Sequence, residues 1–282
     1  MQITELCHAD VLKILPDRNP TAHKGDFGKI LLLCGSRGYT GAAALCAMGA
    51  LRCGAGLVYL GVPESIYEIE AVKLTEPIVF PLPDENGMWS AKAVEKIQSM
   101  LPGMDAVLIG CGMGRSAGSY AVVESVLRSY SGPVVLDADG INVLSGHIDI
   151  LRGRTGVTIL TPHEVEFQRV GGKLTCDRAE SARVFAEQMN SIVLLKGHRS
   201  VVTDGAQMYV NPTGNPGMAV GGSGDVLAGM IASLLGQGID ALKATACAAW
   251  LHGAAGDLCS EEIGQYGMLP TDMLKVLPRL LK

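Results

Sequence analysis

Residues 211–229 read NPTGNPGMAVGGSGDVLAG, a run of turn-forming residues that passes directly into an apolar helix expected over 223–235. The first N–H groups of an α-helix have no partner within the helix. Those of Gly222, Ser223, Gly224 and Asp225 would therefore point out of the helix end and form an anion hole. Asp225 lies in the first turn of that helix, so this stretch predicts an anion site with a carboxylate beside it.

The chemistry that suits such a site is phosphoryl transfer. An anion hole formed by Gly222, Ser223 and Gly224 can stabilise charge on a transferring phosphoryl group, and the Asp225 carboxylate can take the proton from the attacking hydroxyl. An Asp that only complements the helix dipole would explain one acidic residue, but not the glycines and the serine around it. We therefore predict that the chain binds a nucleoside phosphate and transfers a phosphoryl group, with Asp225 as the catalytic base.

Outward from this helix, short aliphatic runs alternate with Ala-rich helical stretches, which is typical of a parallel sheet covered by helices on both faces. The expected strands are 30–33, 57–60, 106–109, 134–136, 158–160 and 192–195. The expected helices are 41–53, 90–100, 119–129, 178–189, 223–235 and 242–258. Asp204-Gly205, between the runs 200–203 and 207–210, indicates an antiparallel hairpin that ends the parallel series. We interpret residues 77–86 as a surface excursion and expect a single domain over residues 1–282.

The bulk composition restricts the class of protein. With 282 residues, 48% hydrophobic and 18% charged, the chain can bury a large core, which excludes disordered and fibrous classes. A net charge of -5 without a cluster of Lys and Arg gives no electrostatic footprint for nucleic acid or an anionic membrane. The first residues, which include Glu5 and Asp10, do not show the basic region and apolar stretch typical of a signal peptide, and no run reaches the length of about 20 apolar residues that crossing a bilayer requires. We expect a soluble, cytoplasmic protein with small-molecule ligands and with no nucleic-acid or membrane partner.

The eight cysteines do not resemble a disulfide framework. Cys34 ends an apolar run, Cys46 and Cys53 lie in one Ala-rich helix, and Cys247 lies in another. A chain of this size needs no disulfides, and no pair has convincing zinc-ligand spacing. We interpret the cysteines as buried free thiols in a reducing compartment.

Polar and small residues follow the expected strands, where ligands of open α/β sheets collect. The loops 34–41 and 110–114 (GCGMG) allow close backbone approach to an anion, although an ordinary turn explains the first equally well and the second lacks the full dinucleotide fingerprint. Asp137 and Asp139, after the strand 134–136, could hold a hydrated Mg²⁺ or cap the helix that follows.

Two further strand ends carry candidate ligand contacts. After 158–160, Thr161 is the expected helix cap, Pro162 the expected first helical residue and Glu164 a first-turn acid, which leaves His163 as a substrate contact. After 192–195, the loop 196–200 (KGHRS) suits phosphate contacts, and a solvated loop is equally compatible with it. His252, within 242–258, is interpreted as a packing residue at helical spacing rather than as a ligand.

Taken together, these motifs resemble those of the ADP- or ATP-dependent NAD(P)H-hydrate dehydratases, a family of the ribokinase-like superfamily. The run GGSGDVL at 221–227 looks like the anion-hole signature of the superfamily, in which the Asp is the catalytic base. The narrower resemblance lies in HKGDFGK (23–29), TGAA (40–43), LDADG (136–140), LTPHE (160–164) and NPGMA (215–219). It implies a ribokinase-like three-layer α/β fold, with a mostly parallel central sheet flanked by helices and an antiparallel hairpin near the sheet edge.

The resemblance also implies an activity, that of a lyase in metabolite repair. Members of the family convert the S epimer of hydrated NADH or NADPH (NADHX, NADPHX) back to the cofactor, by phosphorylating the hydrate hydroxyl and eliminating the phosphate. By position, the hydrated dinucleotide would be bound by Ala42, Gly112, Gly114, His163 and Asp225. The ADP or ATP would be bound by Lys196, Gly197, His198, Arg199, Ser200 and Gly224.

The resemblance implies partners as well. Mg²⁺ is expected with the nucleotide, ADP is favoured over ATP as the phosphoryl donor, and a homo-oligomer, a tetramer, is expected. No fused epimerase domain is recognised, so a separate NAD(P)HX epimerase is expected in the pathway. Cys111 stands where family members usually have proline, which leaves open which glycine of 110–114 contacts substrate.

Two other functions are compatible with the anion hole and its base. One is a related small-molecule kinase that acts on a vitamin-precursor alcohol, and the other is a nucleotide-binding regulatory module without catalysis. The sequence indicates no preference between NADHX and NADPHX. No acidic residue that would bind the ribose hydroxyls and no Arg that would bind a ribose phosphate can be assigned.

Overall fold

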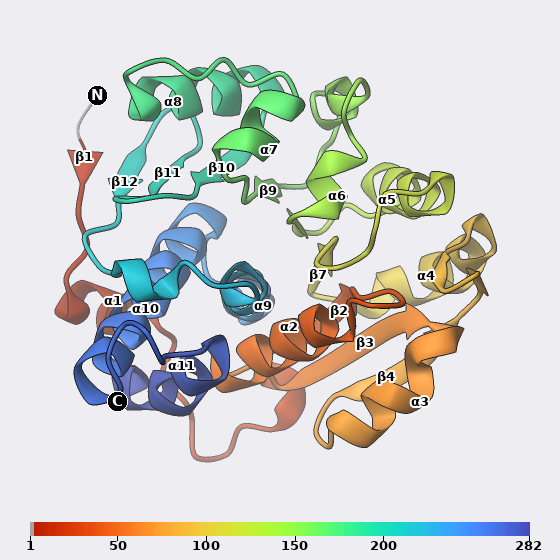
Figure 1. Cartoon of the computed structure of the whole chain (residues 1–282), viewed down its shortest axis with the longest axis horizontal. Coiled ribbons are helices and arrows are strands. Elements are labelled where there is room, and N and C mark those ends of the chain that lie inside the picture. Colours follow the sequence, from red (N-terminus) through yellow and green to blue (C-terminus); the bar gives the residue numbers. More distant parts are fainter. Residues whose placement is uncertain (1–2) are drawn as a thin grey trace.

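A ten-stranded, mostly parallel sheet crosses the computed structural model, which describes residues 3–282 (Figure 1). Its strand order is β1-β12-β11-β10-β9-β8-β7-β2-β3-β4. The strands are β1 (Ile3–Thr4), β2 (Lys29–Leu33), β3 (Leu57–Pro63), β4 (Ile78–Leu82), β7 (Ala106–Ile109), β8 (Val134–Leu136), β9 (Thr158–Leu160), β10 (Ile192–Leu195), β11 (Val201–Thr203) and β12 (Met208–Val210). β11 pairs antiparallel with both of its neighbours, and the other adjacent pairs are parallel.

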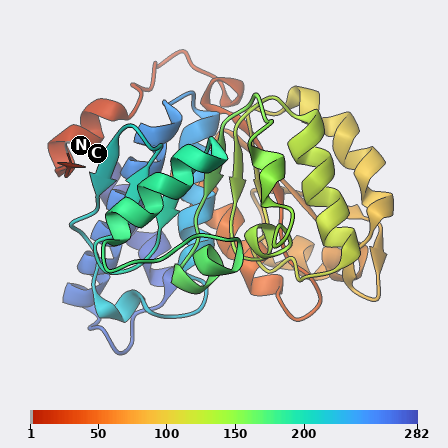
Figure 2. The ribbon, with the colours of Figure 1, turned by 90° about the horizontal axis from the view of Figure 1, so that it is seen from above.

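Helices cover both faces of the sheet, because alternate side chains of each buried strand point to opposite sides. In β2, Ile30 and Leu32 pack into one apolar cluster, and Leu31 and Leu33 pack into the other. The first cluster includes residues of α1 (His8–Ile14), α2 (Thr40–Arg52), α3 (Glu64–Lys73), α9 (Ser223–Gly236), α10 (Ala241–Glu262) and α11 (Pro270–Val276). The second includes residues of α4 (Val94–Met100), α5 (Ala117–Ser129), α6 (Asp139–Asn142), α7 (Glu164–Arg169) and α8 (Arg178–Met189), which face the viewer in Figure 2.

The predicted core of the fold is confirmed. All six expected strands are present, the expected hairpin is found as β11 and β12, and two further strands, β1 and β4, lie at the two edges of the sheet. Each expected helix is found within a few residues of its predicted ends. The interval 90–100 divides into a 3₁₀ turn (Ala91–Ala93) and α4. Among residues 3–282, no helix has both the length and the apolar character that crossing a bilayer requires.

The interpretation of 77–86 as a surface excursion is wrong. β4 lies within it, pairs parallel with β3 and forms the edge of the main sheet, and a small hairpin follows from β5 (Asp84–Glu85) and β6 (Met88–Trp89). Pro81 masks the strand in the sequence, but an edge strand tolerates proline because one of its sides has no ladder to complete.

The prediction that the cysteines are free thiols is confirmed. The prediction that they are buried is confirmed only in part. All eight are free thiols, of which six are buried, whereas Cys7 and Cys176 are exposed.

Helix α9 is the innermost helix, with eleven of its fourteen residues buried. It lies against α2 with almost no side chain between the two backbones, because a glycine stands at each point of closest approach. A Cβ on Gly229 would come 2.1 Å from the Cys46 carbonyl oxygen, and a Cβ on Gly49 would come 2.6 Å from the Val226 carbonyl oxygen. The α9 N-terminus, which carries Asp225, is therefore held at a fixed distance from the loop before α2.

We predict that Gly229→Ala lowers the free energy of unfolding by at least about 2 kcal/mol, because the added methyl group forces two packed backbones apart. Gly41→Ala is the matched control, since a Cβ on this α2 glycine meets no atom within 4 Å. The control should change stability by no more than about 1 kcal/mol, in the stabilising direction. Urea unfolding of both variants measures the difference, and equal stabilities would contradict the packing argument.

Candidate active site

The order in which successive strands are added to the sheet reverses between β2 and β7. The chain adds β3 and β4 on one side of β2 and then returns to place β7 on the other side. Such a switch leaves a crevice at the carboxyl ends of the two strands, where open α/β sheets bind ligands. The loops 34–39 and 110–116 border this crevice and are tied together, because Gly35 N–H donates to the Cys111 carbonyl at 2.8 Å and Ser36 Oγ donates to the Gly112 carbonyl at 2.8 Å.

The 110–114 loop needs its glycines. Gly110 has a φ of +127°, and a Cβ there would lie 2.1 Å from the Asp137 carbonyl oxygen. Gly112 has a φ of +62°, and a Cβ there would lie 2.8 Å from the Cβ of Ala42. Two predicted substrate contacts, Ala42 and Gly112, are thus neighbours in the crevice. The N–H of Gly114 donates to Asp139 Oδ2 at 2.9 Å, so this third predicted contact has its amide engaged within the protein.

The N-terminus of α9 faces the same crevice. The helix is preceded by Gly222 in a left-handed conformation, with a φ of +98°, and has no side-chain cap. Ser223 N–H donates to the Val220 carbonyl at 3.3 Å. Within residues 3–282, the N–H groups of Gly222, Gly224 and Asp225 have no acceptor, so they remain available to an anion.

The predicted anion hole is supported from behind by His252, on α10. Its Nε2 donates to the Ser223 carbonyl at 2.9 Å and lies 3.4 Å from the Ser223 hydroxyl. Burial lowers the pKa of the imidazole to about 4, so the ring is neutral at physiological pH. His252 therefore orients the first turn of α9, and the interpretation of a plain packing residue omits this role.

Asp225 is half-buried at the floor of the crevice. One of its carboxylate oxygens, one of Asp137 and the Cys111 sulfur all lie within 4.8 Å of one another. Burial, together with the negative charge of Asp137, raises the pKa of the Asp225 carboxyl to about 7. A carboxyl poised near neutrality is what a general base needs, because it can be ionised before the reaction and can still hold a proton during it.

Asp137 is the centre of the polar contacts beside that base. Its Oδ1 accepts from Lys196 Nζ at 2.8 Å and from Thr161 Oγ1 at 2.6 Å, and its Oδ2 accepts from the Cys111 thiol at 3.3 Å. Burial alone would lower the pKa of the Lys196 ammonium, but the carboxylates of Asp137 and Glu166 raise it above its usual value. A Cβ on Gly224 would lie 3.4 Å from Lys196 Nζ, so a lasting positive charge stands next to the anion hole.

The carboxylates of Asp137 and Asp139, the two candidate Mg²⁺ ligands, both accept hydrogen bonds from other groups of the protein. The oxygens of Asp137 are occupied as described above. Those of Asp139 accept from Gly114 N, Arg115 Nε and Asn142 Nδ2. These two groups therefore do not fit a direct Mg²⁺ site, because the ion would have to displace bonds that hold the loops together.

The predicted start of α7 is wrong by two residues. The helix begins at Glu164, and His163 is its cap, with Nδ1 accepting from the N–H groups of Val165 at 3.2 Å and Glu166 at 3.3 Å. Glu166 completes a capping box by accepting from His163 N–H at 3.0 Å. Thr161, the expected cap, instead donates to Asp137. The His163 side chain is half exposed, with a relative accessibility of 51%.

The 196–200 loop is held by contacts within the protein. Arg178 donates to the carbonyls of Lys196 and His198, both at 3.0 Å, and Arg199 pairs with Glu5. Gly197, His198 and Arg199 are exposed, and the Ser200 hydroxyl donates to the Gly197 carbonyl at 3.0 Å. The loop is thus held by other residues of the protein, and its Lys196 side chain reaches Asp137 beside Asp225.

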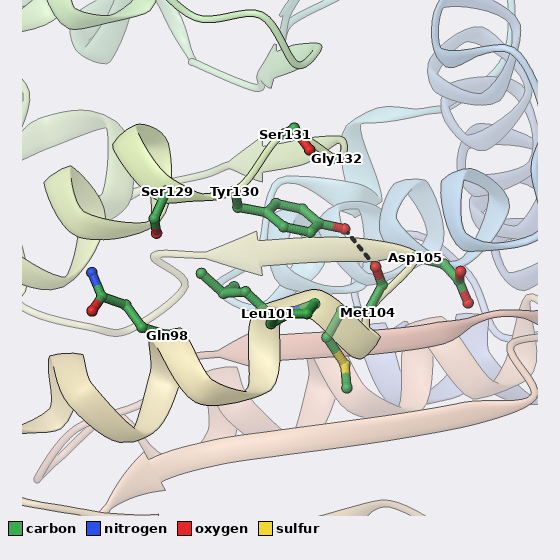
Figure 3. Close-up of a pocket in the computed structure, with 9 residues that line it drawn as sticks. Gln98, Leu101, Met104, Asp105, Ser129, Tyr130, Ser131 and Gly132 are labelled. Atoms are coloured by element: carbon green, nitrogen blue, oxygen red, sulfur yellow. Dashed lines mark hydrogen bonds between the residues drawn. The ribbon is translucent and has the colours of Figure 1, made fainter.

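A separate hollow of about 480 Å³ lies at the other end of the strands (Figure 3). Its wall includes Asp105 and Gly132, which precede β7 and β8, and Tyr130, whose hydroxyl donates to the Met104 carbonyl at 2.8 Å. It therefore lies at the amino ends of the strands, away from the carboxyl ends where Asp225 and the anion hole meet.

Comparison with known proteins identifies relatives over almost the whole chain. The sequence model of a family described as NAD(P)H-hydrate dehydratase matches residues 30–279. The chain is 42% identical over 275 residues to the bifunctional NAD(P)H-hydrate repair enzyme Nnr of Moorella thermoacetica, covering 95% of this chain and 52% of that protein. It is 40% identical over 267 residues to the Nnr protein of Gloeobacter violaceus, covering 89% of this chain and 50% of that protein. The chain thus spans about half the length of these curated relatives.

Solved structures agree with the fold. The ADP/ATP-dependent NAD(P)H-hydrate dehydratase of Bacillus subtilis, crystallised with ATP and Mg²⁺, has a TM-score of 0.85 and 31% sequence identity, covering 99% of this chain and 98% of that chain. A ribokinase-like protein of Enterococcus faecalis has a TM-score of 0.87 at 24% identity, covering 99% of this chain and 95% of that chain, and so supports the ribokinase-like fold alone. With the family match extending over most of its length, this chain belongs to the NAD(P)H-hydrate dehydratase family.

Proposed function

We propose that the chain is a nucleotide-dependent NAD(P)H-hydrate dehydratase, a lyase that restores NADH or NADPH from its S hydrate. The observation that carries the proposal is Asp225, a half-buried carboxyl whose pKa is raised to about 7 and which stands beside the uncapped N-terminus of α9. The family match supplies the substrate class, and the site supplies the groups that the reaction needs.

In the proposed reaction, the Asp225 carboxylate removes the proton from the hydrate hydroxyl. The hydroxyl oxygen then attacks the terminal phosphorus of the nucleotide, and the bond from that phosphorus to the bridging oxygen breaks, so that AMP leaves from ADP or ADP leaves from ATP. The free N–H groups of Gly222 and Gly224 and the Lys196 ammonium stabilise the charge on the transferred phosphoryl group. In the phosphate ester formed on the ring, the C–O bond to phosphate breaks and the adjacent ring carbon loses a proton, which gives the double bond of the reduced nicotinamide. Phosphorylation thus converts a poor leaving group, hydroxide, into a good one.

The hydrated dinucleotide is proposed to lie along Ala42, Gly112, Gly114 and His163, with its reactive ring over Asp225. The donor is proposed to approach from the 196–200 loop, where exposed backbone of Gly197 and His198 can meet its ribose or phosphates. Mg²⁺ is proposed to accompany the nucleotide phosphates and to neutralise their charge. No protein ligand is assigned to it, because Asp137 and Asp139 are already bonded.

The proposal has finer parts. From the resemblance we propose ADP in preference to ATP as donor, assembly into a homotetramer, and an epimerase activity supplied from outside residues 1–282. From the composition and the free cysteines we propose a cytoplasmic location. The curated relatives are bifunctional by name and about twice as long as the matched part.

The first test is the reaction itself. Purified protein with Mg²⁺ and either ADP or ATP should restore the near-ultraviolet absorbance of reduced nicotinamide from the S hydrate, with one phosphate released per cofactor. Parallel rates with the two donors give the preference, which we expect to favour ADP. A stable phosphorylated product without elimination would indicate a small-molecule kinase instead, and nucleotide binding without turnover would indicate a regulatory module.

Asp225→Asn should lower kcat by about 10²- to 10⁴-fold, since an amide cannot accept the hydroxyl proton. Nucleotide affinity, measured by calorimetry, should change little. Asp272→Asn is the matched control, because Asp272 is also the third residue of its helix, α11. If Asp225 only complemented a helix dipole, the two variants would both keep their turnover and lose similar small amounts of stability.

The raised pKa of Asp225 also predicts the pH profile. Because the base acts when ionised, kcat/KM should fall by about tenfold per pH unit below about 7. Asp137→Asn removes a negative charge that raises this pKa, so the acid limb of the profile should move to lower pH. An acid limb that stays in place in Asp137→Asn would mean that a different group titrates.

A further inference from the structure

Three thiols meet beneath the catalytic base. The sulfur atoms of Cys34, Cys46 and Cys111 lie within 4.8 Å of one another, and all three residues are fully buried. They come from three separate parts of the chain, namely the residue after β2, the second turn of α2 and the loop after β7. A cysteine that only fills a core needs no other cysteine beside it, whereas three sulfurs around one point form most of a metal coordination sphere.

The spacing suits a thiophilic ion. Tetrahedral zinc binds thiolate sulfur at about 2.3 Å, which places its sulfur ligands about 3.8 Å apart. Sulfurs already within 4.8 Å need only small movements of their side chains to reach that arrangement. The backbone that carries two of them is fixed, because Gly35 N–H donates to the Cys111 carbonyl at 2.8 Å. Sulfur ligands favour soft and borderline ions such as Zn²⁺, Cd²⁺ and Cu⁺ over Mg²⁺.

A fourth ligand can come from a second group of converging side chains, which shares Cys111 with the first. Cys111 belongs to both groups of converging side chains, since its sulfur also lies within 4.8 Å of carboxylate oxygens of Asp137 and Asp225. Asp137 is committed to Lys196 and Thr161, at 2.8 and 2.6 Å. Asp225 is half-buried, and within residues 3–282 no backbone or cationic group forms a hydrogen bond to its carboxylate. Asp225 is therefore the carboxylate beside Cys111 that is free to bind an ion held by the three thiols.

We propose that Cys34, Cys46 and Cys111 bind one thiophilic metal ion of the Zn²⁺ class, that Asp225 completes a four-coordinate site, and that the bound ion stops turnover by occupying the base. Binding converts three thiols into thiolates and releases their three protons to solvent, without any change in oxidation state. The binding part stands without the proposed function. The inhibition part rests on Asp225 being the base of that function.

The binding experiment uses the protein in a Cys7→Ser, Cys176→Ser background, which removes the two exposed thiols. Titration with Cd²⁺ under reducing conditions, without nucleotide, should give one equivalent per chain and the charge-transfer absorbance of three thiolates. Co²⁺ should give the visible bands of a four-coordinate thiolate site. Cys46→Ala should abolish the three-thiolate signal, whereas Cys259→Ala, which removes an equally buried thiol outside the cluster, should keep it.

The inhibition experiment adds Zn²⁺ to the working enzyme in the same background. One equivalent should reduce turnover at least about tenfold, a chelator should restore it, and Cys46→Ala should need at least about tenfold more Zn²⁺ for the same loss. A signal that survives Cys46→Ala, or that disappears in Cys259→Ala, overturns the site. Stoichiometric binding with turnover unchanged overturns the inhibition. If the protein lacks dehydratase activity, the proposed function fails, and the Cd²⁺ and Co²⁺ signals still decide the metal site.

Discussion

The contact between α2 and α9 is the constraint on which the site depends. Because Gly49 and Gly229 bring the two backbones together, the N-terminus of α9 is positioned by packing in the core and not by a flexible loop. The free N–H groups and Asp225 are thereby directed at the crevice between β2 and β7. The same contact places Cys46 of α2 against α9, so the positions of the Asp225 carboxyl and of the thiol cluster both follow from the packing of these two helices.

The electrostatics of the site follow from where the charges stand in the sheet. β8 supplies Asp137 and the end of β10 supplies Lys196, and the strand order sets them two strands apart, close enough for a 2.8 Å ion pair. That pair places a negative charge near Asp225 and a positive one near Gly224. The first raises the pKa of the base, and the second faces the anion hole, so a single buried pair serves both partners of the proposed phosphoryl transfer.

Local sequence patterns predicted most strands and helices of the fold. They could not predict contacts between residues that lie far apart in the sequence. Strands such as 106–109 and 192–195 were predicted with their observed ends, because uninterrupted aliphatic runs bounded by Gly and Lys leave little ambiguity. β4 was missed because Pro81 disguises an edge strand. The cap of α7 was assigned to Thr161 because Thr is a common cap, yet the buried Asp137 carboxylate accepts the hydrogen bond of that hydroxyl and leaves the cap to His163.

The region of Asp225 and the anion hole could be predicted because one contiguous run carries them. Cys34, Cys46 and Cys111 could not be grouped, since only the strand order brings them together.

The burial of α9 has a consequence for how the active site moves. A helix with eleven of fourteen residues in the core cannot swing outward or melt locally without exposing the apolar surface that stabilises the whole sheet. The helix that carries Asp225 therefore belongs to the last part of the molecule to open. Its hydrogen-bonded amides from Val226 onward should exchange with solvent only on global unfolding, whereas the free N–H groups of Gly222, Gly224 and Asp225 exchange from the native state. The surrounding loops, and not α9, are therefore the parts that can adjust to different substrates. The Asp225 carboxyl stays in position for as long as the protein remains folded.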